Sequence, residues 1–283
     1  MKKTVIAAII FFALGYVVAN RHDLLFAFEQ YRNQATAPEA MARDEVVFVE
    51  SVVEEIEEVK EIEGEKSTST PELPKSEDKD VIPAEAGTQL QAKPAEFNLA
   101  IPFTSQAPHG NWEMPYQEAC EEASILMSSW FINDIKSRTK GEADQEILEL
   151  VAWQEERFGY YKDTTVEETL SIVHEYFGYA DAYIIENPSI KDITDAVAFG
   201  YPVIVPAAGK LLNNPYFTGD GPLYHMLVIR GYAEDEFITN DPGTRRGEQF
   251  RYKQQHIMDV MHDWNGGDVI NGKKAVIIVK NEV

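Results

Sequence analysis

Hydrophobic positions in the C-terminal two thirds of the chain follow first a helical and then an extended pattern. Apolar residues at helical spacing predict helices at 120–132, 143–156, 165–177 and 189–199. Thr165-Val-Glu-Glu has the form of a capping box, which supports a helix start at that point. Gly200 follows the last of these segments, where a glycine commonly ends a helix.

Beyond residue 200 the pattern changes to short runs rich in Val and Ile and bounded by Gly, Pro, Asn and Asp. Such runs are typical of strands. They lie at 201–206, 224–230, 236–240 and 274–280. Because helices come first and strands follow, we expect an α+β domain in which a helix that starts near Cys120 packs on an antiparallel sheet.

The first twenty residues carry a different pattern. Lys2 and Lys3 precede a largely apolar run at 5–19, which predicts a signal peptide or a membrane anchor at 1–20. As a helix this run spans about 22 Å, against about 30 Å for the hydrocarbon core of a bilayer, so both alternatives stay open. In either case the positive start stays inside. We therefore expect an extracytoplasmic protein, membrane-anchored or secreted, that meets the membrane through this segment.

Residues 21–97 separate this segment from the predicted domain. They contain 19 acidic and 8 basic residues, and Pro, Ser, Thr and Glu dominate after Gly64. Few apolar groups are available to offset the entropy of ordering such a chain. We expect an acidic disordered stalk or linker at 21–97, followed by one folded domain at 98–283.

Composition also argues against several classes of function. Residues 98–283 carry 15 basic and 29 acidic residues, whereas nucleic-acid binding requires clustered Lys and Arg, so we expect no nucleic-acid partner. Four histidines show no metal-ligand spacing: His109, His174, His256 and His262. A single cysteine cannot build a thiolate zinc site. We expect no metal and no cofactor.

The single cysteine, Cys120, is the strongest candidate for chemistry. In an exported protein it cannot form an internal disulfide, and at a helix start the macrodipole favours its thiolate. The thiolate is the form that acts as a nucleophile. Glu121 and Glu122 would oppose its formation if they lay near the sulfur, so we expect both side chains to point away.

Two strands downstream supply the partners that a thiol nucleophile needs. We predict a hairpin with a five-residue loop at 231–235, which places Arg230 opposite Glu236 as an ion pair. In this register His225 lies directly opposite Asp241, with Cβ atoms about 4.5–5.5 Å apart. An imidazole and a carboxylate at that separation can form a hydrogen bond, so that one acts as a base and the other orients it.

Strand geometry also decides which side chain faces His225. Because side chains alternate along a strand, Asn240 must point to the opposite face if Asp241 points at His225. A slip of one residue would exchange the two, so the prediction depends on the register.

A thiol hydrolase also needs donors for the negative oxygen that develops on its substrate. The backbone N–H of the nucleophile and a side-chain amide commonly serve. Gln106 lies in a polar loop that can fold back over the helix start, and Gln117 lies three residues before Cys120. We favour Gln106 and keep Gln117 as the alternative.

Four segments resemble those of a known family. They are Ile101-Pro-Phe-Thr-Ser-Gln106, the stretch from Trp112 to Cys120, Gly221-Pro-Leu-Tyr-His225-Met-Leu-Val-Ile-Arg-Gly-Tyr, and Phe237-Ile-Thr-Asn-Asp241-Pro-Gly. They look like the bacterial papain-like cysteine peptidases related to the bacteriocin double-glycine leader peptidases, and the similarity covers residues 99–279. The chain departs from this family in having Glu121-Glu122 where Gly-Pro often follows the cysteine.

The resemblance implies a papain-like fold and a role for each candidate residue. The implied roles are Cys120 as nucleophile, His225 as general base and acid, Asp241 as the residue that orients the histidine, and Gln106 as oxyanion donor. We therefore expect hydrolysis of a peptide or protein substrate through a thioester acyl-enzyme. A transpeptidase or a cell-wall amidase with the same residues is one alternative, and a non-catalytic papain-like binding domain on a stalk is another.

Overall fold

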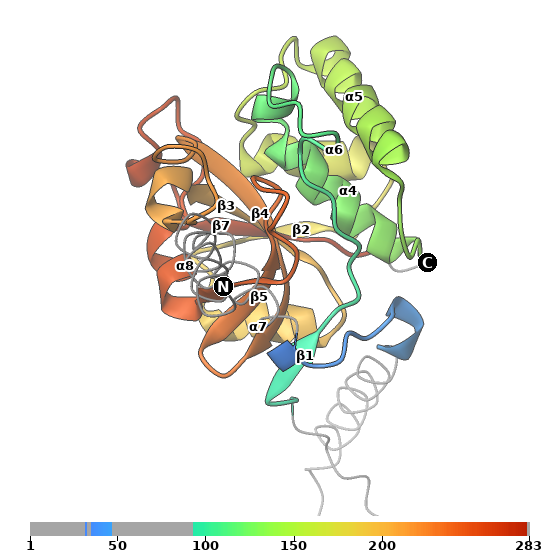
Figure 1. Ribbon diagram of the computed structural model, residues 1–283, viewed down its shortest axis with the longest axis vertical. Helices are drawn as coiled ribbons and strands as arrows, with labels where there is room; N and C mark the ends of the chain where they lie inside the picture. The colour runs from blue at the N-terminus through green and yellow to red at the C-terminus, as the bar shows by residue number, and fades with distance from the viewer. Residues whose placement is uncertain (1–31, 33–34, 47–92, 282–283) are drawn as a thin grey trace, which may run out of the picture.

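The computed structural model describes residue 32, residues 35–46 and residues 93–281 (Figure 1). The segment at 1–20 that we interpret as a signal peptide or membrane anchor lies outside these residues, as does most of the predicted stalk. Within the described ranges, no helix is both long and apolar enough to cross a membrane. The domain consists of helices and an antiparallel sheet, which confirms the α+β prediction.

Strand β4 (Tyr224–Ala233) is the centre of a seven-stranded sheet, and each of its residues is buried. One edge of β4 pairs first with β3 (Val203–Ala208) and then with β1 (Glu96–Asn98), and the other edge pairs with β5 (Glu236–Asn240). The remaining strands are β2 (Tyr183–Glu186), β6 (Phe250–Lys253) and β7 (Ala275–Ile278). The named strands pair antiparallel in the order β2-β7-β3-β4-β5-β6, with β1 beside β4.

Helices pack against this sheet in two groups (Figure 1). Helix α4 (Cys120–Ile132) lies against β4 and β3 and also contacts α5 (Lys140–Arg157) and α6 (Val166–Glu175). The second group contains α7 (Ile190–Ala198) and α8 (Gln254–Val260). Short 3-10 turns are η1 (Arg43–Glu45), η2 (Tyr116–Glu118), η3 (Gly209–Leu212) and η4 (Val269–Asn271).

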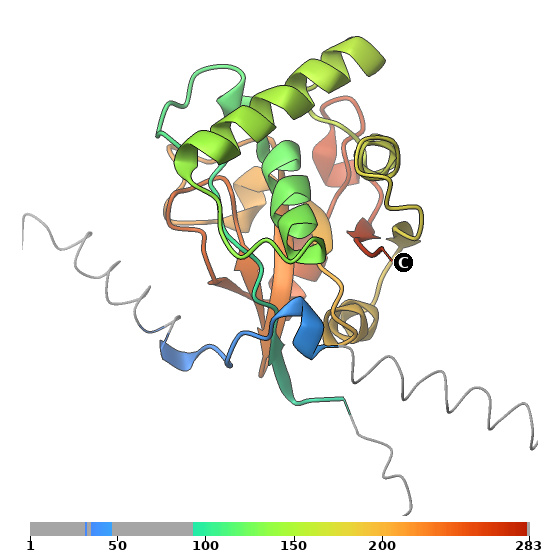
Figure 2. The same cartoon turned by 90° about the vertical axis from the view of Figure 1, so that its right-hand side faces the viewer.

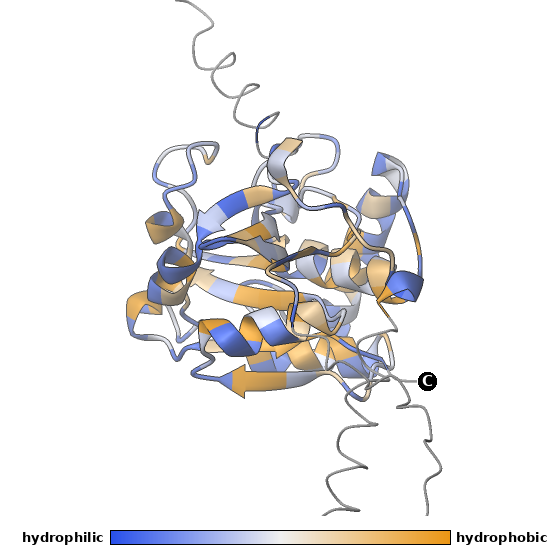
Figure 3. Cartoon of the chain, turned by 90° about the horizontal axis from the view of Figure 1, so that it is seen from below, coloured by the Kyte–Doolittle hydropathy of each residue, from blue (hydrophilic) through white to orange (hydrophobic). Residues whose placement is uncertain are grey.

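Helix α4 is buried on all sides because nearly all of its residues are apolar or small. Its residues from Cys120 to Phe131 are all buried, which is typical of a helix in the interior of a domain. The indole of Trp130 donates a hydrogen bond to Glu146 of α5 at 2.6 Å. Hydrophobic residues likewise concentrate on the central strands (Figure 3). The first residue of α4 is therefore held inside the domain, against β4.

The hydrophobic pattern identifies the main elements. The helices predicted at 143–156, 165–177 and 189–199 appear as α5, α6 and α7, and Thr165 forms the predicted capping box. The four predicted strands appear as β3, β4, β5 and β7. Strands β1, β2 and β6 and helix α8 were not predicted because they are short, and β2 has no buried face that would produce an alternating pattern.

The β4–β5 hairpin differs from the prediction in its loop. Ala233 pairs with Glu236, so a two-residue loop, Glu234-Asp235, replaces the predicted loop of five. The longer strand forms because residues 231–233 also pair with β1 on the other edge of β4. A bulge at Arg230 then shifts the register by one residue. The predicted pairing of Arg230 with Glu236 is wrong.

At the bulge, Arg230 is buried and anchors the segment that follows β1. Its Nε donates to Asn98 Oδ1 at 2.9 Å and its Nη1 donates to the carbonyl of Ile101 at 2.9 Å. Asn240 Nδ2 donates to the same carbonyl at 3.1 Å. Burial lowers the pKa of Arg230 to about 10, and these hydrogen bonds compensate the buried guanidinium. Together they fix the chain a few residues before Gln106.

Residues 35–46 fall within the predicted stalk but pack on the domain (Figure 2). The N–H of Met41 donates to the carbonyl of Asn98, and the N–H of Ala100 donates to the carbonyl of Met41, both at 2.8 Å. Strand β1 likewise begins at Glu96, before the predicted domain boundary at 98. The folded part of the chain thus extends beyond that boundary and includes 35–46.

Two side chains fasten the end of this segment. Val46 is 3% exposed, and its Cγ1 lies 2.5 Å from the position that a Cβ on Gly200 would take. Gly200 also has a φ of +88°, so the end of α7 requires glycine for two reasons. Arg43 donates to the carbonyls of Gly200 at 3.5 Å and Asn281 at 3.4 Å. Composition did not reveal this docking because backbone hydrogen bonds and one valine provide most of it.

We predict that Val46→Ala lowers the free energy of unfolding by about 2 kcal/mol, because two buried methyl groups leave a cavity against Gly200. Chemical denaturation measures the change. Asp44→Asn, at an exposed position two residues earlier, is the matched control and should differ from the wild type by less than about 0.5 kcal/mol. Equal stability of the two variants would contradict the docking.

Candidate active site

The centre of the candidate site is a buried pair formed by His225 and Asp241. Nε2 of His225 lies 2.8 Å from Oδ1 of Asp241, and the two side chains are 1% and 0% exposed. With an ionised carboxylate as partner, Nε2 carries the hydrogen of a neutral imidazole, and Nδ1 then has the free lone pair. The ring is thus oriented to accept a proton at Nδ1.

The predicted pairing of the two residues forms, although the register that led to it was wrong. Asn240 pairs with Val228, so Asp241 falls just beyond the end of β5 and lies diagonal to His225 instead of directly opposite. The shorter loop and the bulge together displace the register by an even number of residues. Asp241 therefore keeps the face that we predicted, and Asn240 points away from His225, toward Ile101.

Asp241 is held by donors on both of its oxygens. Oδ1 accepts from His225 and from the N–H of Gly243 at 3.0 Å, while Oδ2 accepts from Asn214 Nδ2 at 2.9 Å and from the hydroxyl of Tyr252 at 2.7 Å. Burial alone would raise the pKa of Asp241, but His225 and these hydrogen bonds outweigh it and lower the pKa. The carboxylate stays ionised and cannot rotate freely.

Sequence reasoning missed Asn214 and Tyr252. Asn214 comes from the loop after η3, and Tyr252 belongs to β6, a strand that the hydrophobic pattern did not predict. No motif connects these residues to Asp241 along the chain. The one signal available was that a buried aspartate requires several donors.

The ring of His225 is also fixed by its neighbours. Phe217 packs edge-on against it, with ring centroids 5.3 Å apart. A Cβ on Gly243 would lie 2.8 Å from Cε1 of His225, so only glycine allows the turn after Asp241 to approach the ring so closely. Packing and hydrogen bonding together leave the imidazole one orientation.

Cys120 is the first residue of α4, as predicted, but the environment of its thiol differs from the expectation. The side chain is 6% exposed, and Sγ donates to Oε2 of Glu121 at 3.0 Å. Burial, followed by the charge of Glu121 and its hydrogen bond, raises the pKa of the thiol well above its ordinary value. A hydrogen bond from the backbone of Met226, the residue after His225, acts in the opposite direction. The sulfur therefore lies against β4, next to the backbone of Met226.

The expectation that both glutamates point away from the sulfur is correct for Glu122 and wrong for Glu121. Oε1 of Glu122 accepts from Gln154 Nε2 of α5 at 2.5 Å. Oε1 of Glu121 accepts from the backbone N–H of Thr164 at 3.2 Å, which holds the other oxygen of this carboxyl against the thiol. Spacing along the helix could not show this contact, because its anchor lies in the loop before α6.

The side chain of Gln106 does not offer a free donor in this structure. Its Nε2 donates to the carbonyls of Tyr116 at 2.9 Å and Gln117 at 3.0 Å, and its backbone N–H donates to Pro242 at 3.0 Å. Gln106 thus lies next to the turn that carries Asp241. Its side chain is hydrogen-bonded to the backbone of η2. The side chain of Gln117 is exposed. The N–H of Cys120, at the start of α4, remains as a backbone donor without an intrahelical partner.

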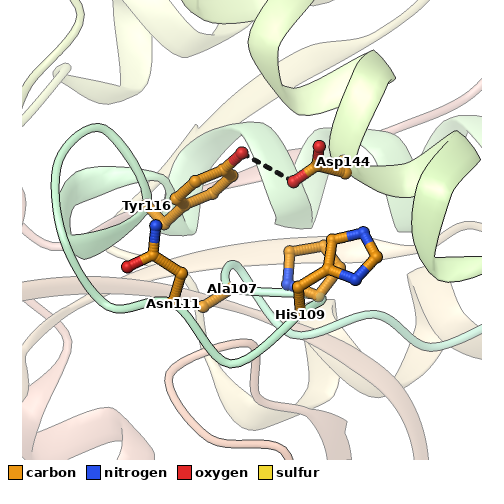
Figure 4. Close-up of a pocket in the computed structure, with 6 residues that line it drawn as sticks. Ala107, His109, Asn111, Tyr116 and Asp144 are labelled. Carbon is orange, nitrogen blue, oxygen red and sulfur yellow. Dashed lines mark hydrogen bonds between the residues drawn. The ribbon is translucent and has the colours of Figure 1, made fainter.

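A pocket opens at the loop that begins with Ala107, the residue after Gln106 (Figure 4). Its walls come from the loop that follows Gln106, from η2 and from α5. The lining residues are Ala107, Pro108, His109, Asn111, Tyr116 and Asp144. The hydroxyl of Tyr116 donates to Asp144 at 2.6 Å, and burial together with this carboxylate raises the pKa of Tyr116 to about 12.

No group of three or more His, Cys, Asp or Glu side chains in the described part of the chain is arranged to hold a metal ion.

Mixed helices, an antiparallel sheet and a cysteine at the start of a buried helix define a papain-like α+β fold. Residues 98–266 match the model of the Peptidase_C39 like family, which is more than half of the chain. The protein therefore belongs to this family, and the resemblance seen in the sequence is confirmed.

Two further comparisons complete this result. No curated protein matches the chain. Among solved structures, a C39-like peptidase from Bacillus anthracis aligns with 15% sequence identity and a TM-score of 0.44, over 66% of this chain and 99% of that one.

Proposed function

We propose that this protein is a cysteine peptidase that hydrolyses peptide bonds through a thioester intermediate on Cys120. The observation that carries the proposal is the buried pair of His225 and Asp241, whose geometry leaves Nδ1 of the imidazole as a base. Membership of the C39-like peptidases supports the same reaction class. Cys120, the first residue of the buried helix that packs on β4, supplies the nucleophile.

In the proposed reaction, Nδ1 of His225 accepts the thiol proton and the thiolate attacks the carbonyl carbon of the substrate. The carbonyl oxygen becomes negative and accepts a hydrogen bond from the N–H of Cys120. His225 then donates its proton to the leaving amine, and a thioester remains on the sulfur. Water, deprotonated by His225, hydrolyses the thioester and restores the thiol.

Gln106 takes part as an oxyanion donor only if its amide exchanges a bond with Tyr116 or Gln117 for one with substrate. We propose such an exchange, because Gln106 lies between the turn that carries Asp241 and the residues that lead into α4. The adjoining pocket would then accept a substrate side chain, and the carboxylate of Asp144 in its wall favours one that donates hydrogen bonds.

We place this reaction outside the cytoplasm on the pattern of residues 1–20 alone, with Lys2 and Lys3 before an apolar run. The substrate would accordingly be an extracytoplasmic peptide or protein, met by a secreted or membrane-anchored enzyme.

Digestion of a peptide library, followed by a rapid acid quench and mass spectrometry, tests the proposal. We expect new peptide termini and a transient mass increase on the peptide that contains Cys120, which identifies the thioester. Joined peptides in place of hydrolysed ones would indicate a transpeptidase. Release of fragments from peptidoglycan alone would indicate a cell-wall amidase.

A non-catalytic binding domain is the second candidate, and one observation favours it. The thiol is bonded to Glu121, and its pKa is raised well above the ordinary value, which opposes nucleophilic attack. Peptides retained by the protein without cleavage and without an adduct on Cys120 would support this candidate.

A further inference from the structure

Glu121 has no part in the proposed mechanism, yet it contacts the thiol of Cys120. Sγ donates to Oε2 of Glu121 at 3.0 Å, and Thr164 holds the other carboxyl oxygen at 3.2 Å. Both side chains are buried, at 6% and 1% exposure. A thiol has one hydrogen, so while it is bonded to Glu121 it cannot also donate to His225.

The groups around this carboxyl are themselves acidic. They are Glu122 on α4, Asp163 in the loop before α6, and Tyr224 on β4 with its partner Asp263, while Glu118 on η2 acts on the neighbouring Glu122. Burial and the neighbouring Glu122 raise the pKa of Glu121 well above its ordinary value. When Glu121 is charged, it opposes a second negative charge on the sulfur at hydrogen-bond distance.

The same neighbourhood shows why this carboxyl stays in place. Glu122 reaches toward α5, and its Oε2 has no hydrogen-bond partner among the described residues. Glu121 instead has a donor on each oxygen, one from the backbone of Thr164 and one from the thiol. Both oxygens of Glu121 therefore accept a hydrogen bond, and the thiol hydrogen has an acceptor. The thiol gives up this hydrogen bond only if a better acceptor is available.

We propose, on the basis of the proposed peptidase function, that Glu121 is a positioning residue that keeps the Cys120 thiol protonated in the free protein. Activation then requires the thiol hydrogen to pass from its bond with Glu121 to Nδ1 of His225. In that step the S–H bond breaks, an N–H bond forms on the imidazole, and the electron pair stays on sulfur. Oε2 of Glu121 loses its hydrogen-bond donor in the same step. Before that step the thiol of the free protein is protonated, and it is therefore weakly reactive.

Alkylation of the full-length protein with iodoacetamide as a function of pH tests this role, because only the thiolate reacts. Glu121→Gln keeps the size of the side chain and an oxygen for Thr164 but replaces the oxygen that accepts from the thiol with an amide N–H, which favours the thiolate. We expect it to lower the pKa of the thiol by at least about one unit and to raise the alkylation rate at pH 7 about tenfold or more.

Glu122→Gln is the matched control, since it makes the same chemical change on the next residue, which is equally buried but bonds Gln154 instead of the sulfur. We expect its alkylation rate to rise less than about threefold. Adding His225→Ala to Glu121→Gln should remove most of the gain, because the imidazole is the proposed acceptor of the proton.

An alkylation profile of Glu121→Gln that matches the wild type would overturn the proposal, as would an equal gain in Glu122→Gln. If Glu121→Gln does not fold, the ultraviolet absorbance of the wild-type thiolate decides instead. A thiolate that is already present at pH 7 in the free protein would refute the role of Glu121, whereas one that appears only at alkaline pH supports it.

The alkylation assay uses no peptide, so it separates this inference from the proposed function. A gain in Glu121→Gln without peptide cleavage by any variant would support the role of Glu121 and refute the peptidase. Peptide cleavage by the wild type with no gain in Glu121→Gln would do the reverse.

Discussion

Replacing Cys120 by alanine is expected to lower the rate of peptide cleavage by at least about 10⁴-fold, because no other group at the site can form the covalent intermediate. The fold should persist. Alanine fits where the thiol lies and removes two polar contacts, the hydrogen bond to Glu121 and the one from the backbone of Met226. The comparison uses kcat on a peptide identified from the library, with the melting temperature measured in parallel.

Ser124→Ala is the matched control for this substitution. Ser124 is buried one turn further along α4, and its hydroxyl has no hydrogen-bond partner among the described residues, so its loss should not reduce cleavage. Cleavage by Cys120→Ala at the wild-type rate would eliminate the thiol as nucleophile. Loss of cleavage in both variants would point to a disturbed helix in place of a missing nucleophile.

His225→Ala is expected to reduce kcat by about 10³–10⁴-fold, and Asp241→Asn by roughly 10–100-fold. The difference follows from the contacts of the carboxylate. An asparagine can still accept from Nε2 of His225 and from Gly243 through one oxygen, so the ring keeps its orientation. Its amide would then face the donors of Asn214 and Tyr252, and the negative charge that stabilises an imidazolium is lost.

The pH dependence of kcat/KM measured for both variants shows whether the imidazole acts as the base. Because the ring can keep its hydrogen bond in Asp241→Asn, that variant should retain a pH dependence that His225→Ala loses. A rate in Asp241→Asn below that of His225→Ala, or equal rates in both variants and the wild type, would be incompatible with the assigned roles.

Features of this domain that depend on residues close together in the sequence were predicted better than those that depend on distant segments. Helices α5, α6 and α7 were found because their caps and hydrophobic periods are local. The pairing of His225 with Asp241 was found through two errors that cancelled, since the shorter hairpin loop and the bulge at Arg230 preserve the alternation of faces. Alternation is therefore a sounder basis for such a prediction than the exact register.

Interactions between distant segments were not predictable. The direction of Glu121 depends on an N–H in the loop before α6, and the bonds of Gln106 depend on the carbonyls of η2. Tyr252 reaches Asp241 from a strand with too few residues to show a period. Each of these contacts involves a polar group whose partner is chosen by the packed fold, and hydrophobic patterns carry no information about that choice.

The docking of residues 35–46 changes how far the domain can stand from a membrane. Residues 35–46 are held on the domain, so a tether that begins at the N-terminus ends at residue 35 and not at the predicted domain boundary of 98. If the segment at 1–20 serves as an anchor, residues 21–34 alone determine the reach of that tether. At about 3.3–3.6 Å per residue they extend to roughly 50 Å, against about 250 Å for the whole of 21–97. An anchored enzyme of this geometry would act on substrates close to the bilayer surface.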